Sequence, residues 1–341
     1  MTTHSPKKPA DGAGDVAVPA SGLTDRQSGD GRPNQPPTAR RPRGDGRAIR
    51  QLRRNRSAMA ALGFLVLAAL AALAAPLLAP FDPAAQDLIN QLQGPSFEHW
   101  LGTDNFGRDV LSRLLFGARV TLVAVVQALI IAAVAGIPLG LLAGYLGGPV
   151  DAIMSRISDA LLSLPPLILA LAIVGILGPG LTNVMLAIGI VLAPPLFRLS
   201  RGAAQSVASE TYIEACRAIG CSPWRILWRH VLPNVSSPLL VQLTFSAGVI
   251  IIAEASLSFL GLGVRPPDAS WGTMLRDAFD VIYESPYFLV SPALMVVSTI
   301  LSFAVFGDGL RDALEGRGVS APREKRGIRG ILRAATSRGQ R

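Results

Sequence analysis

The chain has 341 residues, a formal net charge of +9 and a hydrophobic content of 50%. This hydrophobic content, gathered in long runs, excludes an ordinary soluble domain and favours a protein that crosses a membrane several times. The positive charge lies at the ends: residues 1–57 hold 12 Lys and Arg against 5 Asp and Glu, and residues 308–341 hold 9 against 4. In a membrane protein, basic ends predict that both termini are cytoplasmic.

The sequence also limits the chemistry that the chain can perform. Its three histidines are scattered at positions 4, 99 and 230, without the spacing of metal ligands. None of its three lysines is followed by Ser or Thr, so the chain has no phosphate-binding P-loop. We therefore expect no enzymatic activity, no metal and no cofactor, and a separate ATPase subunit if ATP drives the protein.

The first part of the chain divides into a tail, a span and a polar segment. Residues 1–57 are rich in Pro, Gly, Ser, Asp and Arg without an apolar period, which predicts a disordered basic cytoplasmic tail. Residues 58–80 are apolar over a length that can cross a bilayer. Residues 81–116 are mostly polar and are expected outside the membrane. There, Thr103 or Asp104 is expected to cap a short helix with four apolar residues on one face: Val110, Leu111, Leu114 and Leu115.

Five further apolar runs predict five more spans, at residues 120–146, 157–177, 181–197, 235–257 and 285–306. Gly136, Gly140 and Gly144 share one face of the second span, where small residues allow another helix to pack closely. Prolines 165 and 166 are expected to kink the third span. The sequence thus predicts an all-α membrane protein with a membrane domain at 58–307, followed by a basic cytoplasmic tail at 308–341.

The long polar interval at residues 198–234 separates the fourth and fifth spans. Thr211 and Glu214 have the spacing of a capping box at the start of a helix. Gly220 stands where a helix end needs a residue that tolerates the left-handed conformation. The interval holds five arginines, whereas the turn at 178–180 holds none, so the arginine bias places this interval in the cytoplasm.

A second short helix is expected after the glycine. Ser222 and Pro223 have the character of a cap and a first helical residue, and the helix is expected to end at Leu232-Pro233. Cys216 and Cys221 lie on either side of the turn and are expected to stay reduced in a cytoplasmic loop. Two short helices joined by a tight turn form a compact knob suited to a groove on another protein.

The order Glu214-Ala215-Cys216, then Gly220, then Leu232-Pro233 resembles the EAA loop of ABC importer permeases. Cys216 stands where the family pattern has a second alanine, and His230 stands where it has isoleucine. The resemblance implies that this loop carries coupling helices held in a cleft of an ATPase subunit. The residues that it assigns to the contact are Glu214, Ala215, Gly220, Leu232 and Pro233.

Other stretches resemble one branch of that family, the dipeptide, oligopeptide and nickel permeases of the C type. They are residues 99–122, 255–267 and the SWGTM that begins at Ser270. The resemblance implies the fold of a type I importer permease with six transmembrane helices, located in the inner membrane. It further implies a second permease subunit, two ATP-binding subunits, an external solute-binding protein and transport by alternating access. The substrate, a peptide or a related solute such as nickel, is not fixed by the sequence.

Glu254 is the only acidic residue well within the fifth span, about one turn from its outer end. Because burial of a carboxylate in a membrane is expensive, such a residue is a functional candidate. It lines the translocation path, pairs with an arginine of a partner subunit, or reaches the outer interface; the sequence leaves these three interpretations open.

Two other classes of function deserve comparison with the importer. A secondary transporter is expected to show coupling carboxylates near the midplane and internal repeats, but the sequence has only the off-centre Glu254 and no repeat. A membrane-anchored protein that binds nucleic acid through its basic tails is expected to show a recognisable fold or interleaved aromatic residues in those tails, and neither is present.

Overall fold

The structure is a computed structural model that describes residues 45–315, and within this range every regular element is a helix. Five helical segments are long and apolar enough to cross a membrane, and a bent pair of helices makes a sixth if it is counted as one span. The described residues therefore agree with the predicted number of spans. The five segments are α2 (Arg56–Leu73), α4 (Val110–Leu146), α7 (Leu181–Ala208), α9 to α10 (Pro223–Phe259) and η2 to α12 (Pro286–Glu315).

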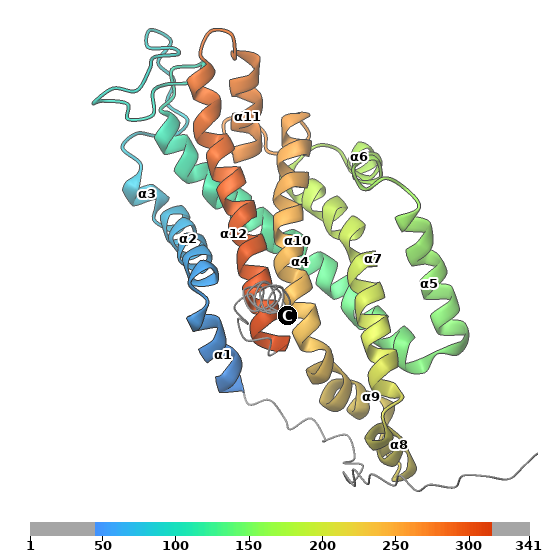
Figure 1. The fold of residues 1–341 in the computed structure, drawn as a ribbon. Helices are drawn as coiled ribbons and strands as arrows, with labels where there is room; N and C mark the ends of the chain where they lie inside the picture. Colours follow the sequence, from blue (N-terminus) through green and yellow to red (C-terminus); the bar gives the residue numbers. More distant parts are fainter. Residues whose placement is uncertain (1–44, 316–341) are drawn as a thin grey trace, which may run out of the picture. The chain divides into compact units, whose positions relative to one another are not determined.

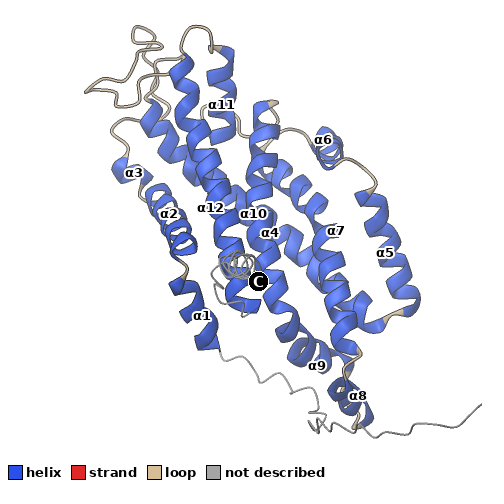
Figure 2. Ribbon diagram, in the orientation of Figure 1, coloured by secondary structure: helices blue, strands red, loops and turns tan. Residues whose placement is uncertain are grey.

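The long helices run side by side within residues 45–315 (Figures 1 and 2). Helix α4 packs along α7, α10 contacts both of them, and α12 joins α10 to α2. On the other side of α7 lies α5 (Gly148–Leu162). One end of the bundle carries α8 (Thr211–Ala218) and α9 (Pro223–Ile226), and the opposite end carries α11 (Trp271–Asp280) with the segment before α4 (Figure 1). These two groups are called the α8 end and the α11 end below.

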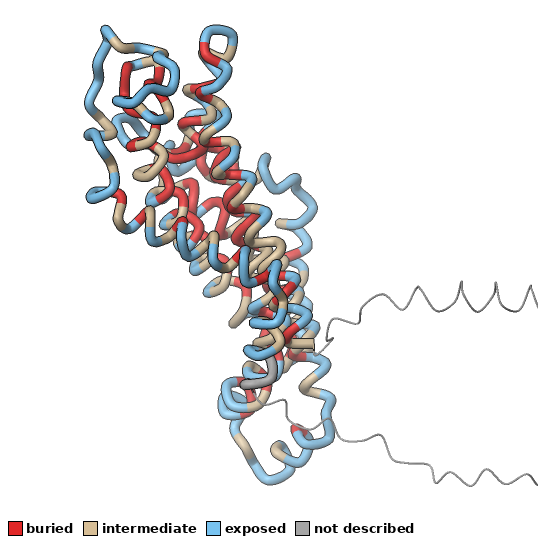
Figure 3. The backbone as a smooth tube through the Cα atoms, turned by 60° about the vertical axis from the view of Figure 1, so that its left-hand side comes forward, coloured by how far each residue is buried: buried red, intermediate tan, exposed pale blue. Residues whose placement is uncertain are grey.

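The buried core lies between α4, α7 and α10, where the buried positions gather in the middle of the helices (Figure 3). Its largest apolar side chains include Met185, Ile188, Ile250, Leu257 and Trp271. The outward faces of the same helices stay apolar and exposed, as expected for helices that meet lipid or another subunit.

The predicted glycine face of the second span is confirmed as a packing seam between α4 and α7. A Cβ on Gly136 would lie 2.5 Å from the backbone oxygen of Ala193, and one on Gly144 would lie 2.4 Å from that of Arg201. At Gly140 the added atom would be 2.1 Å from the Oγ of Ser200. Only glycine therefore allows the two backbones to approach this closely.

The predicted disordered tail at 1–57 is wrong for its last part. Helix α1 (Asp45–Arg54) precedes α2, and Asn55 caps α2 by accepting a 3.2 Å hydrogen bond from Ala58 N. The Nε2 of Gln51 donates a 3.0 Å hydrogen bond to the backbone oxygen of Asp312. Contact with α12 thus stabilises a stretch that its composition alone assigns to a tail. The remaining part of this prediction, residues 1–44, lies outside the described residues.

Helix α12 (Val290–Glu315) also extends past its predicted end at residue 306, so the second tail does not begin at 308. Residues 316–341 lie outside the described residues. The helix follows a short 3₁₀ turn, η2 (Pro286–Leu289), and another short helix, α3 (Ala75–Leu78), follows α2.

The predicted short helix in residues 81–116 is the beginning of α4, and its cap is neither Thr103 nor Asp104. Asp109 caps α4, because its Oδ2 accepts a 2.8 Å hydrogen bond from Ser112 N. Asp104 instead closes a tight loop, in which its Oδ1 accepts from the backbone N of Phe106 and of Arg108. Several aspartates near a helix start compete for the role of cap, and spacing alone does not decide among them.

The predicted third span is two helices rather than one kinked helix. Helix α5 begins at Gly148, nine residues before the predicted start, and α6 (Pro166–Leu177) meets it at an angle of 94°. Pro165 lies in the break, and Pro166 is the first residue of α6. Two successive residues without a backbone N–H remove two helical hydrogen bonds, so the helix breaks rather than bends.

The prediction that the second short helix ends at Leu232-Pro233, before a separate fifth span at 235–257, is also wrong. Helix α9 continues through a π-helical turn, η1 (Leu227–Val231), into α10 (Leu232–Phe259) without interruption. In the π turn, Leu232 N bonds to Leu227 O, one residue further back than in an α-helix. We attribute the passage of the helix through Pro233, which has no N–H, to this shifted hydrogen-bond register.

Candidate functional site

The candidate coupling site is the helix–turn–helix unit formed by α8, α9 and η1 at the α8 end. Helix α8 begins at Thr211, with Glu210 in an extended conformation before it and no side-chain cap. The predicted capping box of Thr211 and Glu214 is therefore wrong. Thr211 has already entered the helix, so Glu214 does not reach back to it and lies exposed on the surface of α8.

The turn after α8 confirms the predicted helix stop at Gly220, whose φ is +80°. Gly220 N donates to Arg217 O at 3.0 Å, and Cys221 N donates to Cys216 O at 3.0 Å. These two bonds form a Schellman motif, which requires a left-handed residue at the glycine position. Ser222 then accepts from Arg225 N and Pro223 is the first residue of α9, as predicted.

Cys216 and Cys221 are both free thiols and both half-buried. Burial raises the pKa of the Cys216 thiol, and the neighbouring Cys221 acts in the same direction. A raised pKa leaves little thiolate at neutral pH, so this thiol is a poor nucleophile.

The inward side of the unit is apolar and fixed to the long helices. The buried side chains of Ile213, Ile226, Leu227 and Val231 form one cluster with apolar residues at the ends of α4, α7 and α10, namely Leu141, Ala204, Val235 and Leu239. Leu232 packs against this cluster, whereas Pro233 is exposed. Burial on three long helices means that the unit moves together with them.

The outward side of the unit exposes large apolar side chains. Ile219 is 79% exposed and Trp224 is 60% exposed, and Tyr212 and Trp228 are also exposed. Glu214, Ala215 and Gly220 are exposed too, so the structure brings three of the predicted site residues to one surface. Exposed aromatic and apolar side chains on a rigid unit are typical of a surface that binds another protein.

Glu254 lies far from this unit, near the α11 end of α10. Its side chain is fully buried, and its Oε1 accepts a 2.8 Å hydrogen bond from the Oγ of Ser258, one turn further on. The other oxygen, Oε2, has no hydrogen-bond partner among the described residues. Glu254 therefore does not reach an outer surface of this chain, which rules out the third interpretation offered by the sequence. Whether it lines the path or meets an arginine of a partner subunit stays a prediction, and either role requires the surrounding helices to part first, because the side chain is buried inside this chain alone.

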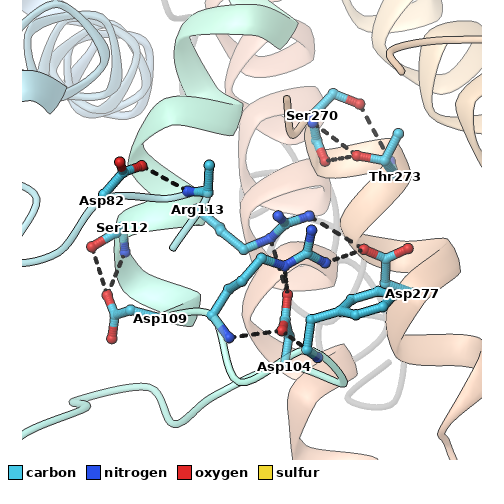
Figure 4. A network of polar contacts seen from close by, with 11 residues as sticks. Asp82, Asp104, Asp109, Ser112, Arg113, Ser270, Thr273 and Asp277 are labelled. Carbon is cyan, nitrogen blue, oxygen red and sulfur yellow. Dashed lines mark hydrogen bonds and ion pairs between the residues drawn. The ribbon is translucent and has the colours of Figure 1, made fainter. Parts of the chain in front are cut away.

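Sequence reasoning missed a buried ion-pair cluster at the α11 end (Figure 4). Arg108 and Arg113 both lie against Asp104, with Nε to Oδ2 distances of 2.7 and 3.3 Å. Both arginines also reach Asp277 of α11, at 3.3 and 3.2 Å. The cluster thus ties the segment before α4, the start of α4 and α11 together.

Asp104, Arg108 and Arg113 are buried, although they belong to a segment that the sequence predicts as mostly polar and outside the membrane. Burial raises the pKa of the Asp277 carboxyl, and the two arginines act against that rise. The sequence could have indicated the contact of Asp104 with Arg108 and Arg113 through their spacing. It could not indicate Asp277, which lies 164 residues beyond Arg113 and is brought to it only by the fold.

Comparison with known proteins gives two matching family models. The model described as "Binding-protein-dependent transport system inner membrane component" matches residues 136–318, and the model described as "N-terminal TM domain of oligopeptide transport permease C" matches residues 46–95. The second match begins inside α1, the helix that was predicted as tail.

Curated relatives match over most of their length. A dipeptide transport system permease protein of Alkalihalophilus pseudofirmus is 42% identical over 79% of this chain and 88% of its own. Glutathione transport system permease proteins of Pectobacterium atrosepticum and of Escherichia coli O157:H7 are 42% and 44% identical, each over 78% of this chain and 89% and 88% of their own. Among solved structures, a chain of an inward-facing methionine ABC transporter, MetNI, aligns with a TM-score of 0.49 and 21% identity, over 60% of this chain and 95% of its own.

Proposed function

Because the chain belongs to the family of binding-protein-dependent transport system inner membrane components, we propose that it forms half of the translocation path of an ABC importer for short peptides. The chain is a membrane transport permease, and ATP hydrolysis belongs to separate subunits. The observation that carries the proposal is the α8–α9 unit, whose inward side is buried on α4, α7 and α10 while its outward side exposes Glu214, Gly220 and Trp224.

The class of substrate is supported by the relatives. Permeases named for dipeptide and for glutathione transport are both more than 40% identical to this chain, and both names denote short peptides.

The proposed partners are a second permease subunit, two ATP-binding subunits and an extracytoplasmic solute-binding protein. The proposed orientation places both termini and the α8 end in the cytoplasm of a multi-pass inner membrane protein. Five arginines in residues 198–234 and the basic ends of the chain support this orientation. In this orientation the exposed face of α8 and α9 lies on the cytoplasmic side, the side on which an ATP-binding subunit would bind.

The proposed mechanism is alternating access through a rigid lever. ATP-driven closure of the partner subunits displaces α8 and α9. Because α9, η1 and α10 form one helix of 37 residues, a displacement at Trp224 tilts the whole of α10. The ends of α4 and α7 follow, since they share the buried cluster around Ile213 and Ile226. The spans thereby close one side of the path and open the other.

The test is cross-linking combined with uptake. Trp224→Cys in a Cys216→Ser, Cys221→Ser background is expected to cross-link to a co-expressed ATP-binding subunit, whereas Val134→Cys on the exposed apolar face of α4 is not. Uptake of radiolabelled dialanine into vesicles that hold the complete complex is expected to need internal ATP. Uptake driven by an ion gradient without ATP hydrolysis would instead identify a secondary transporter.

A further inference from the structure

The buried carboxyl of Glu254 lies where α10 contacts α11. Ser258, whose Oγ donates to Glu254 Oε1, packs against Gly272 of α11, so that a Cβ on Gly272 would lie 2.7 Å from the Ser258 Cβ. The side chain of Ser270, the cap of α11, also approaches the Glu254 carboxyl. The start of α11 therefore supplies part of the cover that keeps this carboxyl from the surface.

Helix α11 is fixed to α4 by polar contacts. Trp271 N donates to Thr121 Oγ1 at 3.3 Å, and Trp271 Nε1 donates to Leu114 O at 3.2 Å. Two turns further along α11, Asp277 forms an ion pair with Arg113 of α4 (Figure 4). Because these contacts hold α11 at two places along its length, α11 and the beginning of α4 form one unit.

The contact between α10 and α11 is of a different kind, and we call it the α10–α11 interface. Within residues 45–315 no hydrogen bond or ion pair joins the residues of these two helices. A Cβ on Gly272 would lie 2.8 Å from Ala255 Cα, and the rings of Phe259 and Phe279 meet edge-on with centroids 5.5 Å apart. An interface without directional bonds can separate without leaving broken polar pairs behind.

The closed interface is unfavourable for Glu254 itself. Oε2 has no hydrogen-bond partner among the described residues, and a buried polar group without a partner is costly. If α10 moves away from α11, water reaches Oε2 and offsets part of the apolar contact that is lost. The closed and open arrangements are therefore closer in free energy than the burial of this region alone indicates.

The fold also contains a motion that would open the interface. Helices α9, η1 and α10 form one helix of 37 residues, in which Trp224 and Glu254 are about 45 Å apart at a rise of about 1.5 Å per residue. A displacement at Trp224 thus moves the segment that carries Glu254. Because α11 is bonded to α4 and not to α10, a tilt of α10 separates the two helices instead of carrying α11 along.

We propose that the α10–α11 interface is a gate that closes over Glu254 in the arrangement described here and opens to water when α10 tilts. The inference rests on the proposed function for the source of the tilt, an ATP-driven displacement of α9. It identifies the helices that part before the Glu254 carboxyl can meet a cationic group.

The interface is tested first without ATP or substrate. In the complete complex, with Cys216 and Cys221 replaced by Ser, Glu254→Cys is expected to react very slowly with a trimethylammonium methanethiosulfonate. Adding Gly272→Ala places a methyl group within 2.8 Å of two carbon atoms of α10, which forces the helices apart, and is expected to raise the reaction rate at least tenfold. Gly248→Ala, on α10 with its nearest neighbour 3.8 Å away, is the matched control and is expected to leave the rate unchanged.

The coupling to ATP is tested in the same complex without the Gly272 substitution. Glu254→Cys is expected to react at least ten times faster during ATP hydrolysis than without ATP, and Gly220→Val is expected to remove this difference. Ser246→Cys, also buried on α10 and about two turns away, is expected to stay slow in every state. Equal acceleration at positions 246 and 254 would show a general loosening of the helices and would overturn the gate.

Failure of the gate and failure of the proposed function give different results. Slow reaction at position 254 in every state, or acceleration by Gly272→Ala alone, together with ATP-driven uptake of dialanine by the wild-type complex, would overturn the gate and leave the importer standing. Acceleration by Gly272→Ala but not by ATP, together with uptake that needs no ATP, would refute the ATP-driven importer and leave the α10–α11 interface as the part that opens.

Discussion

The side chain of Asn234, in the first turn of α10, donates a 2.9 Å hydrogen bond to the hydroxyl of Tyr212 in α8. The same amide also donates to the backbone oxygen of His230 at 2.8 Å. One side chain thus links α8 to the π turn and to the long helix that follows. A force applied to α8 therefore reaches α10 directly, as well as through the apolar cluster beneath it.

Gly220→Val is expected to uncouple transport while leaving the protein inserted in the membrane. A non-glycine residue at φ +80° costs about 1–2 kcal/mol, and a β-branched one costs more. No atom lies within 4 Å of an added Cβ there, so the effect is conformational strain and not a clash. Uptake and copurification of the ATP-binding subunits are expected to fall at least tenfold. Gly202→Val, at an equally open position inside α7, is the control, and equal loss in both variants would contradict this role of the turn.

Glu214→Ala is expected to weaken the same contact without any change in the fold. Glu214 is exposed and does not form the capping box that its spacing predicts, so the substitution removes a surface charge and little stability. We expect wild-type abundance and thermal stability, with reduced ATP-driven uptake per complex. Normal uptake in both Glu214→Ala and Gly220→Val would refute the coupling assignment.

Gly140→Ala is expected to destabilise the pairing of α4 with α7. The added methyl group would lie 2.1 Å from the Oγ of Ser200 and 2.4 Å from the backbone oxygen of Phe197, so the helices must separate. Such overpacking costs about 1–3 kcal/mol and is expected to lower the melting temperature by several degrees in detergent. Gly175→Ala in α6, where no atom lies within 4 Å of the added Cβ, is expected to leave the melting temperature unchanged.

Asp277→Asn is expected to destabilise the α11 end through the arginines that it leaves behind. Arg108 and Arg113 would keep Asp104 as their only carboxylate among the described residues. Breaking a buried ion pair by removing one partner costs about 3–5 kcal/mol, and the partial exposure of Asp277 places the expected loss at or below the lower limit. Faster proteolysis of the segment before α4 would indicate this loss of stability. Asp280→Asn, exposed on the same helix, should show no such change.

Glu254→Gln separates the two remaining interpretations of that residue. Oε2 has no partner among the described residues, so within this chain the substitution strands no charge, and Ser258 can still donate to the amide oxygen. We expect normal assembly with reduced uptake per complex if the carboxylate acts in transport. A lower yield of assembled complex would instead indicate an arginine of the partner subunit. Wild-type assembly together with wild-type uptake would contradict both.

The orientation is tested by labelling at two exposed positions, Gly94 and Ser206. Single cysteines there, in a background without Cys216 and Cys221, are expected to react with an impermeant thiol reagent from opposite sides of the membrane, position 94 from outside. Reaction of both from the same side would contradict the proposed topology.

The amino-acid sequence by itself determined the all-helical class, a chain of five or six apolar spans and the place of the helix–turn–helix unit of α8 and α9. These features depend on local properties: the length of an apolar run, the conformational freedom of Gly220 and the order of a few residues around it. Such properties act within one or two helical turns, so they can be read from neighbouring residues.

Only the tertiary structure decided features that depend on contacts between distant residues. Helix α1 forms against Asp312, Arg113 meets Asp277 across 164 residues, and Arg198 of α7 meets Asp159 of α5. The tertiary structure also decided where a helix continues past a proline. A π turn lets α9 and α10 form one helix through Pro233, whereas the helix that contains Pro165 and Pro166 breaks into α5 and α6. Whether a charge is paired and buried, or a helix passes a proline, depends on which groups the fold brings within a few ångströms. Spacing along the chain does not contain that information.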